Sequence, residues 1–169
     1  MAARRTPELG RMSWTEVAEI VPENPVLLLP IGTMEQHGPH LPVNADNMVA
    51  EYVALHAAEQ TNAYVLPCIN YGCSAVFRHF PGTIPVRQET LANVIRDVCQ
   101  SLIAHGFRRF IFVDNHGGNE GVCEQVAREL KESTTKSGVI RPLSGSLWPA
   151  SAPPGSADTI SGTSLPNRH

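Results

Sequence analysis

The chain lacks the features that would assign it to several classes of protein. Its 169 residues carry a formal net charge of −3, so no excess of positive charge points to nucleic acid or an anionic membrane as the main partner. No apolar run could cross a bilayer, and no apolar stretch of signal-peptide length follows the basic start Met1–Arg5. The four cysteines form no CxxC pair, which indicates free thiols. We therefore expect a cytoplasmic protein without nucleic-acid or membrane partners.

Apolar runs alternate with helical patterns along most of the chain. Continuous apolar runs predict strands over residues 25–31, 63–69 and 107–114, and a further strand within residues 139–148. Apolar residues at helical spacing predict helices over residues 47–60, 88–105 and 120–132. Ser13 to Glu16 has the pattern of a capping box that opens a short helix. This order predicts an α/β fold in which helices cover both faces of a parallel sheet.

The chain is long enough for one domain with a substantial core. We place an N-terminal tail at residues 1–12, an α/β domain at residues 13–148 and a Ser/Pro/Gly-rich segment at residues 149–169. Ser, Pro, Gly and Thr make up more than half of residues 143–169, a composition that supplies few core residues. This last stretch is either a long functional loop or a segment left without its packing partners.

A group of metal-type side chains follows the apolar run that ends at Ile31. Glu35 and His37 lie two residues apart, a spacing that puts both side chains on one side of an extended chain. Asp46 stands near the expected start of a helix, where its carboxylate could bridge two ions. Carboxylates and imidazoles together suit Zn²⁺ or Mn²⁺. The segment therefore predicts one part of a divalent-metal site.

A second group follows the apolar run of residues 110–113 and contains His116, Gly117 and Gly118. Because the carboxyl ends of parallel strands meet at the same sheet edge, we expect His116 to reach the first group. The two glycines lack a Cβ atom, which would let the backbone approach a ligand closely. A site of two carboxylates and two imidazoles would polarise a carbonyl oxygen and lower the pKa of a bound water from about 15.7 towards about 7. Both effects serve the hydrolysis of an amide-type bond.

A third element, residues 79–83, reads His-Phe-Pro-Gly-Thr, and Tyr71, Ser74 and His79 could line a substrate pocket. Each candidate residue also has a purely structural interpretation, as a turn residue, a helix cap or a hydrogen-bonded side chain. Cys73 lies in the same loop, but no Cys/His/Asn grouping supports a thiol nucleophile. The joint occurrence of the groups at strand ends favours a functional site.

Together, the three elements resemble motifs of the creatininase (creatinine amidohydrolase) family. Residues 35–42 with Asp46 look like its first metal motif, residues 79–83 like its central loop, and residues 115–119 like its third motif. The resemblance runs from about Trp14 to Trp148. It implies a three-layer α/β/α fold with a mainly parallel sheet, and two divalent metals per subunit, Zn²⁺ or Mn²⁺ with Mg²⁺ and Fe²⁺ as alternatives. It also implies a cytoplasmic homohexamer that acts on a small-molecule substrate.

The resemblance assigns a role to each ligand. Glu35 and His116 would hold one metal and His37 the other, while Asp46 would bridge them around a water or hydroxide that acts as the nucleophile. Gly117 and Gly118 would line the substrate site. In creatininases proper, a Glu two residues after the third-motif His completes the second metal, whereas Gly118 occupies that position here.

The end of the chain departs from the family pattern. His169 resembles the first residue of a His-Ala-Gly-Glu segment, in which the family His assists proton transfer to the substrate. The Glu expected after it is absent, together with the family's last strand and helices, so we expect a truncated member. Glu120 is an alternative ligand, but an acid that interacts favourably with the first turn of a helix is the simpler interpretation.

The leading hypothesis is a metal-dependent hydrolase of the creatininase type, which cleaves a non-peptide C–N bond in an amide or cyclic amide with a metal-bound hydroxide. The alternative is a catalytically incomplete fragment or non-catalytic subunit that keeps the fold but lacks the second-metal Glu. A nucleotide-binding α/β domain with residues 115–119 as phosphate loop is a third hypothesis. It lacks both the GxGxxG spacing and the Lys-Ser/Thr of a P-loop. The substrate remains open in every case.

Overall fold

A parallel sheet forms the centre of the computed structural model, which describes residues 6–133 and 139–144. Within these residues the sheet has four strands in the order β2-β1-β3-β4. Their bounds are β1 Val26–Ile31, β2 Tyr64–Val65, β3 Arg109–Asp114 and β4 Val139–Ser144. All neighbouring strands pair in parallel. The expected parallel α/β sheet is therefore confirmed.

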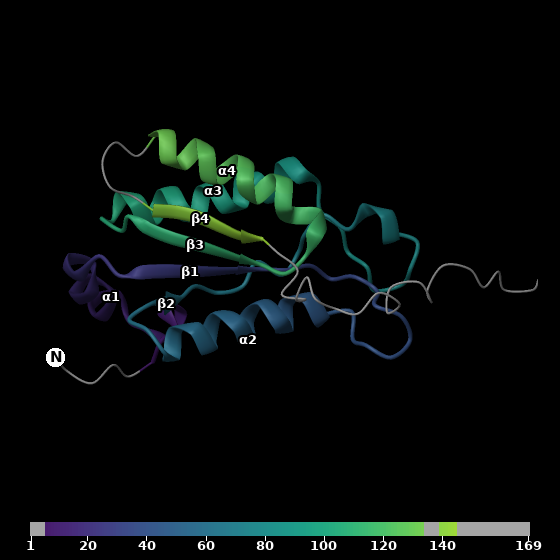
Figure 1. Ribbon diagram of the computed structural model, residues 1–169, viewed down its shortest axis with the longest axis horizontal. Coiled ribbons are helices and arrows are strands. Elements are labelled where there is room, and N and C mark those ends of the chain that lie inside the picture. The colour runs from purple at the N-terminus through teal and green to yellow at the C-terminus, as the bar shows by residue number, and fades with distance from the viewer. Residues whose placement is uncertain (1–5, 134–138, 145–169) are drawn as a thin grey trace, which may run out of the picture.

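Helices cover both faces of this sheet. The α-helices are α1 Trp14–Ile20, α2 Ala45–Glu59, α3 Gln88–Ala104 and α4 Glu120–Ser133. Short 3₁₀ turns occur at η1 Leu9–Arg11, η2 Val21–Glu23, η3 Ala75–Phe77 and η4 Gly117–Asn119. Figure 1 shows α3 and α4 on one face of the sheet and α2 on the other. This arrangement is the expected three-layer α/β/α fold. Across the described ranges, no helix is long and apolar enough to span a membrane.

Successive side chains of β1 point to opposite faces of the sheet and so belong to two separate core clusters. Leu27 and Leu29 belong to the larger cluster, with Phe110 and Phe112 of β3. Leu28 points the other way and packs in the smaller cluster under α2. Since both faces are covered, the strand reads as one continuous apolar run, which explains why the sequence predicted it.

Most helix predictions are confirmed within one or two residues. The Ser13 side chain accepts a hydrogen bond from the Glu16 backbone N–H, and the Glu16 carboxylate accepts one from the Ser13 N–H, which completes the capping box. α3 ends at Ala104, and Gly106 follows with φ +111°, a conformation that favours glycine. α2 begins at Ala45, two residues earlier than expected, after Asn44 as N-cap residue.

The prediction of a strand over residues 63–69 is wrong for most of its length, because β2 pairs with β1 only at Tyr64 and Val65. Pro67 has no N–H to donate to a ladder, so the chain then follows β1 through separate contacts such as the Ile69 N–H to the Pro30 carbonyl. On its other side, the Val65 N–H donates to the Pro7 carbonyl. Part of the stretch expected as an N-terminal tail, residues 6–12, thus lies against this edge.

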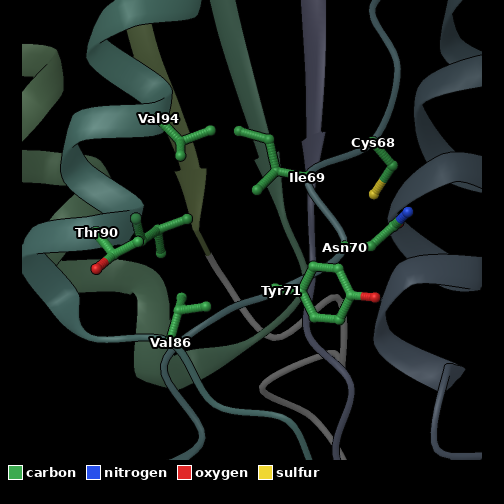
Figure 2. A pocket seen from close by; sticks show the side chains of 8 residues that line it. Cys68, Ile69, Asn70, Tyr71, Val86, Thr90 and Val94 are labelled. Carbon is green, nitrogen blue, oxygen red and sulfur yellow. The ribbon is translucent and has the colours of Figure 1, made fainter.

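A groove of about 340 Å³ opens between α3 and the segment that follows β2. Its walls are mainly apolar and include Ile69, Val86 and Val94. Figure 2 shows Val94 and Thr90 on the α3 side. Tyr71, an expected substrate contact, lines this groove and is 48% exposed.

We expect a large loss of stability when a core side chain of β3 is shortened. Phe110 is fully buried, and Phe110→Ala should lower the free energy of unfolding by about 3–5 kcal/mol, because it removes apolar contact and leaves a cavity. Val76→Ala, at a residue that is 79% exposed, should change it by less than about 0.5 kcal/mol. Urea denaturation followed by circular dichroism measures both variants. Equal effects would contradict the described core.

Candidate metal centre

The carboxyl ends of β1 and β3 bring the two predicted groups of side chains together. Ile31, the last residue of β1, pairs with Asp114, the last residue of β3, and the Asn115 N–H donates to the Ile31 carbonyl. The two loops that leave these strands therefore start side by side. Glu35 lies on one loop and His116 on the other, so the expected meeting at one sheet edge is confirmed.

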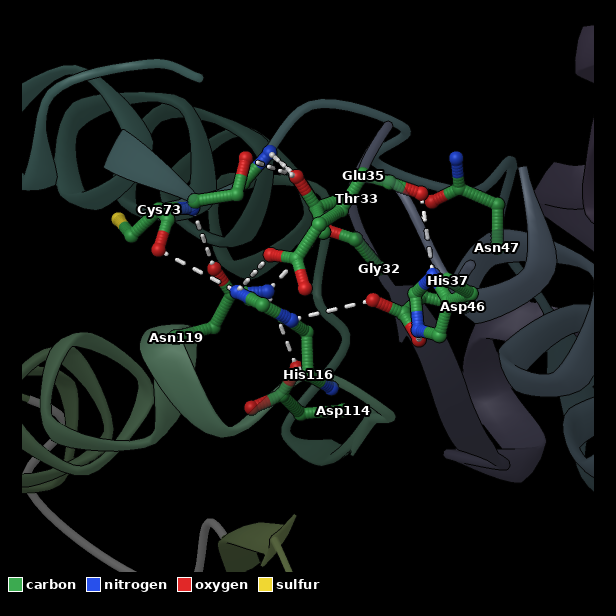
Figure 3. A network of polar contacts seen from close by, with 12 residues as sticks. Gly32, Thr33, Glu35, His37, Asp46, Asn47, Cys73, Asp114, His116 and Asn119 are labelled. Carbon is green, nitrogen blue, oxygen red and sulfur yellow. Dashed lines mark hydrogen bonds and ion pairs between the residues drawn. The ribbon is translucent and has the colours of Figure 1, made fainter. Parts of the chain in front are cut away.

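Asp46, in the first turn of α2, lies between two imidazoles. Its Oδ1 is 3.1 Å from Nε2 of His37, and its Oδ2 is 3.1 Å from Nδ1 of His116. Figure 3 shows the contact between His116 and Asp46 as a dashed line. The aspartate is 5% exposed, so its charge is largely removed from water. One carboxylate that faces a different histidine with each oxygen is suited to bridge two bound ions.

Glu35 completes the cluster from the β1 loop. Its Oε2 lies 3.5 Å from Nε2 of His116, and the residue is 7% exposed. Burial raises the pKa of the Glu35 carboxyl, and the charge of Asp46 raises it further, against the opposite effects of His116 and His37. The four candidate ligands thus form one cluster, in which the two carboxylates are buried and the two imidazoles are half-buried.

Burial also acts on His116, where it favours the neutral ring. The contacts with Asp46, the Cys73 carbonyl and Glu35 outweigh burial, so the pKa of the His116 imidazole is raised. This imidazole is therefore held by negative charge on two sides, as expected for a nitrogen ligand next to carboxylates.

Two buried carboxylate oxygens, Glu35 Oε2 and Asp46 Oδ2, accept no well-formed hydrogen bond among the described residues, and the ring of His116 is the ion-pair contact of each. Such oxygens are costly unless a cation or donor meets them. The donor set, two carboxylates and two imidazoles, fits Zn²⁺ or Mn²⁺. Over residues 6–133 and 139–144, however, no three His, Cys, Asp or Glu side chains are already arranged to hold an ion. Side chains would therefore have to move to reach ligand distances of about 2.0–2.2 Å.

A layer of fully paired amide and hydroxyl groups lies behind the ligands. Asn119 is completely buried, and its Nδ2 donates to the Gly32 carbonyl and to Asp114 Oδ1, each at 3.1 Å. Its Oδ1 accepts from the Cys73 N–H at 2.8 Å. The amide thus joins the ends of both strands to the loop after β2. No pattern in the sequence predicted this role for Asn119, which is the last residue of the third motif.

Ser74, expected as a substrate contact, belongs to this supporting layer. It is 2% exposed, and its hydroxyl lies 3.3 Å from that of Thr33, which is fully buried. The Thr33 hydroxyl also accepts from the Gly72 N–H at 3.1 Å. In this structure the Ser74 side chain therefore packs behind the candidate ligands, and its contact with a substrate stays a prediction.

The remaining predicted substrate residues have different surroundings. His79 is exposed, and its ring lies 4.3 Å from that of Phe80, centroid to centroid. Gly117 is exposed with open space around the position of a Cβ atom. The proton-transfer candidate His169 and the C-terminal segment lie outside the described residues.

The structure adds a second reason for glycine at position 118. A Cβ atom there would collide with the Cys73 carbonyl and lie 2.6 Å from Nε2 of His116. Gly118 thus gives space to the protein's own loop and imidazole, and its contact with a substrate stays a prediction. Gly117 has no such constraint.

The cysteines do not have the properties of nucleophiles. Burial raises the pKa of the Cys68 thiol to about 12, and it raises the pKa of Cys73 as well. Neither thiol would be ionised near neutral pH, which agrees with the expectation against a thiol mechanism.

Gly118 and its neighbour form a matched pair for a first test of the site. Gly118→Ala should lower the free energy of unfolding by about 1–3 kcal/mol, because the Cys73 loop must shift to accept the methyl group. Gly117→Ala should change it by less than about 0.5 kcal/mol. Thermal or urea unfolding of the metal-free protein measures the difference. Similar losses in the two variants would argue against the described packing.

Asp114 should make the stability of the metal-free protein depend on pH. Burial raises its pKa from 3.8 to about 6, against hydrogen bonds from Asn119 and the His116 backbone. Between about pH 4 and pH 6 the folded state therefore holds a proton that the unfolded state has lost. Stability should fall as pH rises through this window, by at most about 3 kcal/mol.

Replacement of the Asp114 carboxyl should remove this dependence of stability on pH. Asp114→Asn keeps an oxygen acceptor and should flatten the stability curve between about pH 4 and pH 6, whereas the exposed Asp97→Asn should leave it unchanged. Chemical denaturation at several pH values, with a chelator present, gives both curves. A slope that persists in Asp114→Asn would assign the dependence to another group.

Comparison with known proteins agrees with the geometry. The family model "Creatininase: Creatinine amidohydrolase" matches residues 10–162. The chain is 33% identical over 138 residues to the mycofactocin precursor peptide peptidase of Mycobacterium tuberculosis, covering 76% of this chain and 55% of the relative. It is 33% identical over 134 residues to the creatinine amidohydrolase of Pseudomonas putida, covering 73% and 51%.

Solved creatininase structures share the fold. One described as the Mn form has a TM-score of 0.75 at 29% identity, and a mutant of Zn–Zn type has 0.71 at 28% identity. Each comparison covers 83% of this chain and 58% of the solved chain. The chain thus spans about half the length of the curated relatives that it matches. On the fold, the clustered ligand types and these matches, the chain belongs to the creatininase family of hydrolases.

Proposed function

We propose that this protein is, or is part of, a metal-dependent amidohydrolase that cleaves an amide-type C–N bond. The observation that carries the proposal is the Asp46 carboxylate between the imidazoles of His37 and His116. The names of the relatives support an amide-type bond, since one is a creatinine amidohydrolase and another a peptidase. A non-peptide or cyclic amide of a small molecule is the substrate class that we propose first.

The four clustered side chains would hold two divalent ions, Zn²⁺ or Mn²⁺. Glu35 and His116 would bind one ion and His37 the second, with Asp46 shared between them. When bound, such ions supply a Lewis acid for a carbonyl oxygen and lower the pKa of a coordinated water. The Mn and Zn–Zn forms of solved relatives support this choice of metals.

The chain's own residues prepare the site through charge and burial. Glu35 and Asp46 place two carboxylates where little water screens them, which strengthens their attraction for a cation. When ionised, both side chains can only accept, and the oxygens without a hydrogen bond are available to a cation. His37 Nδ1 contacts the Glu35 carbonyl at 3.0 Å, so its Nε2 is the nitrogen left to face Asp46.

A catalytically incomplete fragment or non-catalytic subunit is the second candidate, and Gly118 favours it. The crowding around this position leaves no space for a carboxylate side chain without movement of the Cys73 loop. The second ion would then need a ligand from outside the described residues.

We further propose His169 for proton transfer to the substrate and a homo-oligomeric, cytoplasmic protein, in line with the family resemblance.

Metal titration tests the proposal. Isothermal titration of the chelator-treated protein with Zn²⁺ and with Mn²⁺ should show binding, and Asp46→Asn should weaken it by more than about 100-fold, because both contacts with imidazole depend on this carboxylate. The exposed Asp97→Asn serves as control and should bind like the unchanged chain. Two ions per chain would favour the hydrolase, and one ion the incomplete site. Absence of binding, or equal binding by Asp46→Asn, would overturn the proposal.

A further inference from the structure

The third sequence element, residues 79–83, provides no candidate ligand, but its last side chain contacts the ligand loop that follows β1. Thr83 is 9% exposed, and its hydroxyl oxygen accepts a hydrogen bond from the Gln36 N–H at 3.1 Å. Gln36 lies between Glu35 and His37, two of the four candidate ligands. A side chain 47 residues further along the chain thus holds the backbone between them.

A tight turn directs Thr83 towards this loop. The Thr83 N–H donates to the Phe80 carbonyl at 3.1 Å, with Pro81 and Gly82 between the two residues. Gly82 has φ +88°, and a proline followed by a glycine with positive φ is typical of a type II turn. A Cβ atom at Gly82 would lie 3.2 Å from Cγ1 of Val43, so the turn packs against the same loop. The His-Phe-Pro-Gly-Thr motif therefore presents a hydroxyl group to the ligand loop.

Backbone contacts hold the neighbouring residues of the ligand loop. The Glu35 N–H donates to the Val43 carbonyl at 2.8 Å, and the Met34 carbonyl accepts from the Ile84 N–H at 3.0 Å. With the contact at Gln36, three successive residues of the loop are held, and of these three contacts only the last comes from a side chain. A substitution can therefore remove that contact and leave the other two in place.

We propose that Thr83 is a positioning residue, which keeps the ligand loop in the conformation that directs Glu35 and His37 into the candidate metal centre. Loss of its hydroxyl would leave the half-buried Gln36 N–H without an acceptor, and an unpaired N–H group is costly unless it turns to water. The two candidate ligands on either side would then lose their common orientation. The proposal rests on the proposed function, since this orientation matters for an ion that both side chains help to hold.

Amide hydrogen exchange of the metal-free protein tests the contact itself. The Gln36 N–H should be protected in the unchanged chain and exchange about 5–10-fold faster in Thr83→Val, which keeps the side-chain shape and removes the acceptor. Thr83→Ser retains a hydroxyl and should restore the protection. The control Thr15→Val, at an exposed residue of α1 far from the strand ends that carry the ligands, should have no effect (Figure 1). An unprotected Gln36 N–H in the unchanged chain would overturn the proposal, even if Thr83→Val does not fold.

Zn²⁺ titration tests the consequence for the metal centre. Thr83→Val should weaken Zn²⁺ binding by about 10–100-fold, as is typical when a residue that orients a ligand is replaced. Thr83→Ser and the control Thr15→Val should bind Zn²⁺ like the unchanged chain. Co²⁺ in place of Zn²⁺ has a visible absorption spectrum that depends on ligand geometry, and this spectrum should change in Thr83→Val alone. A merely structural role would lower stability and leave the affinity and the spectrum of the folded protein unchanged.

The two measurements separate this proposal from the proposed function. If the unchanged chain binds Zn²⁺ and Thr83→Val binds it equally well, the proposed function stands and the positioning role fails. If the unchanged chain binds neither Zn²⁺ nor Mn²⁺, the proposed function fails, and the exchange of the Gln36 N–H still decides whether Thr83 holds the loop.

Discussion

The parallel pairing of β1 with β3 is the interaction on which the site depends. Six consecutive residue pairs, from Val26 opposite Arg109 to Ile31 opposite Asp114, set the two strand ends at the same level. A slip of one residue would move Leu27 and Leu29 into the smaller cluster and Leu28 into the larger one, so the unequal packing on the two faces favours this register. The loops that carry the acidic and histidine ligands therefore start next to each other, and their side chains meet.

The site combines candidate ligands that have unused acceptor oxygens with a surrounding layer in which the polar side-chain atoms are hydrogen-bonded. Glu35 and Asp46 each keep a buried oxygen that accepts no well-formed hydrogen bond, whereas the amide of Asn119 has a partner for every polar atom. Local departures from the usual pairing of buried groups are expected at functional sites, where the surrounding structure sustains them. The surrounding layer supplies that support, since it joins both strand ends and the loop after β2. The unpaired oxygens mark the place where a cation would lower the energy.

Much of this organisation could be predicted from the sequence, because it depends on local patterns. β1, α3 and α4 follow from apolar runs and helical spacing, and the four candidate ligands follow from residue type at strand ends. The strand expected at residues 63–69 failed because one proline interrupts the ladder after Val65. Asn119 and Thr33 gave no distinguishing signal, since asparagine and threonine near turns are common for local reasons. Their partners lie 87 and 39 residues away in the chain.

The sequence by itself determined which chemical groups are available and in what order the elements carry them: two carboxylates and two imidazoles after two buried strands. Only the tertiary structure decided that Asp46 stands between His37 and His116, and that Gly118 makes room for the Cys73 carbonyl. It also decided which ring nitrogen each histidine turns towards Asp46. The physical reason is that burial and hydrogen-bond partners depend on contacts between distant segments, which packing creates and no local pattern contains.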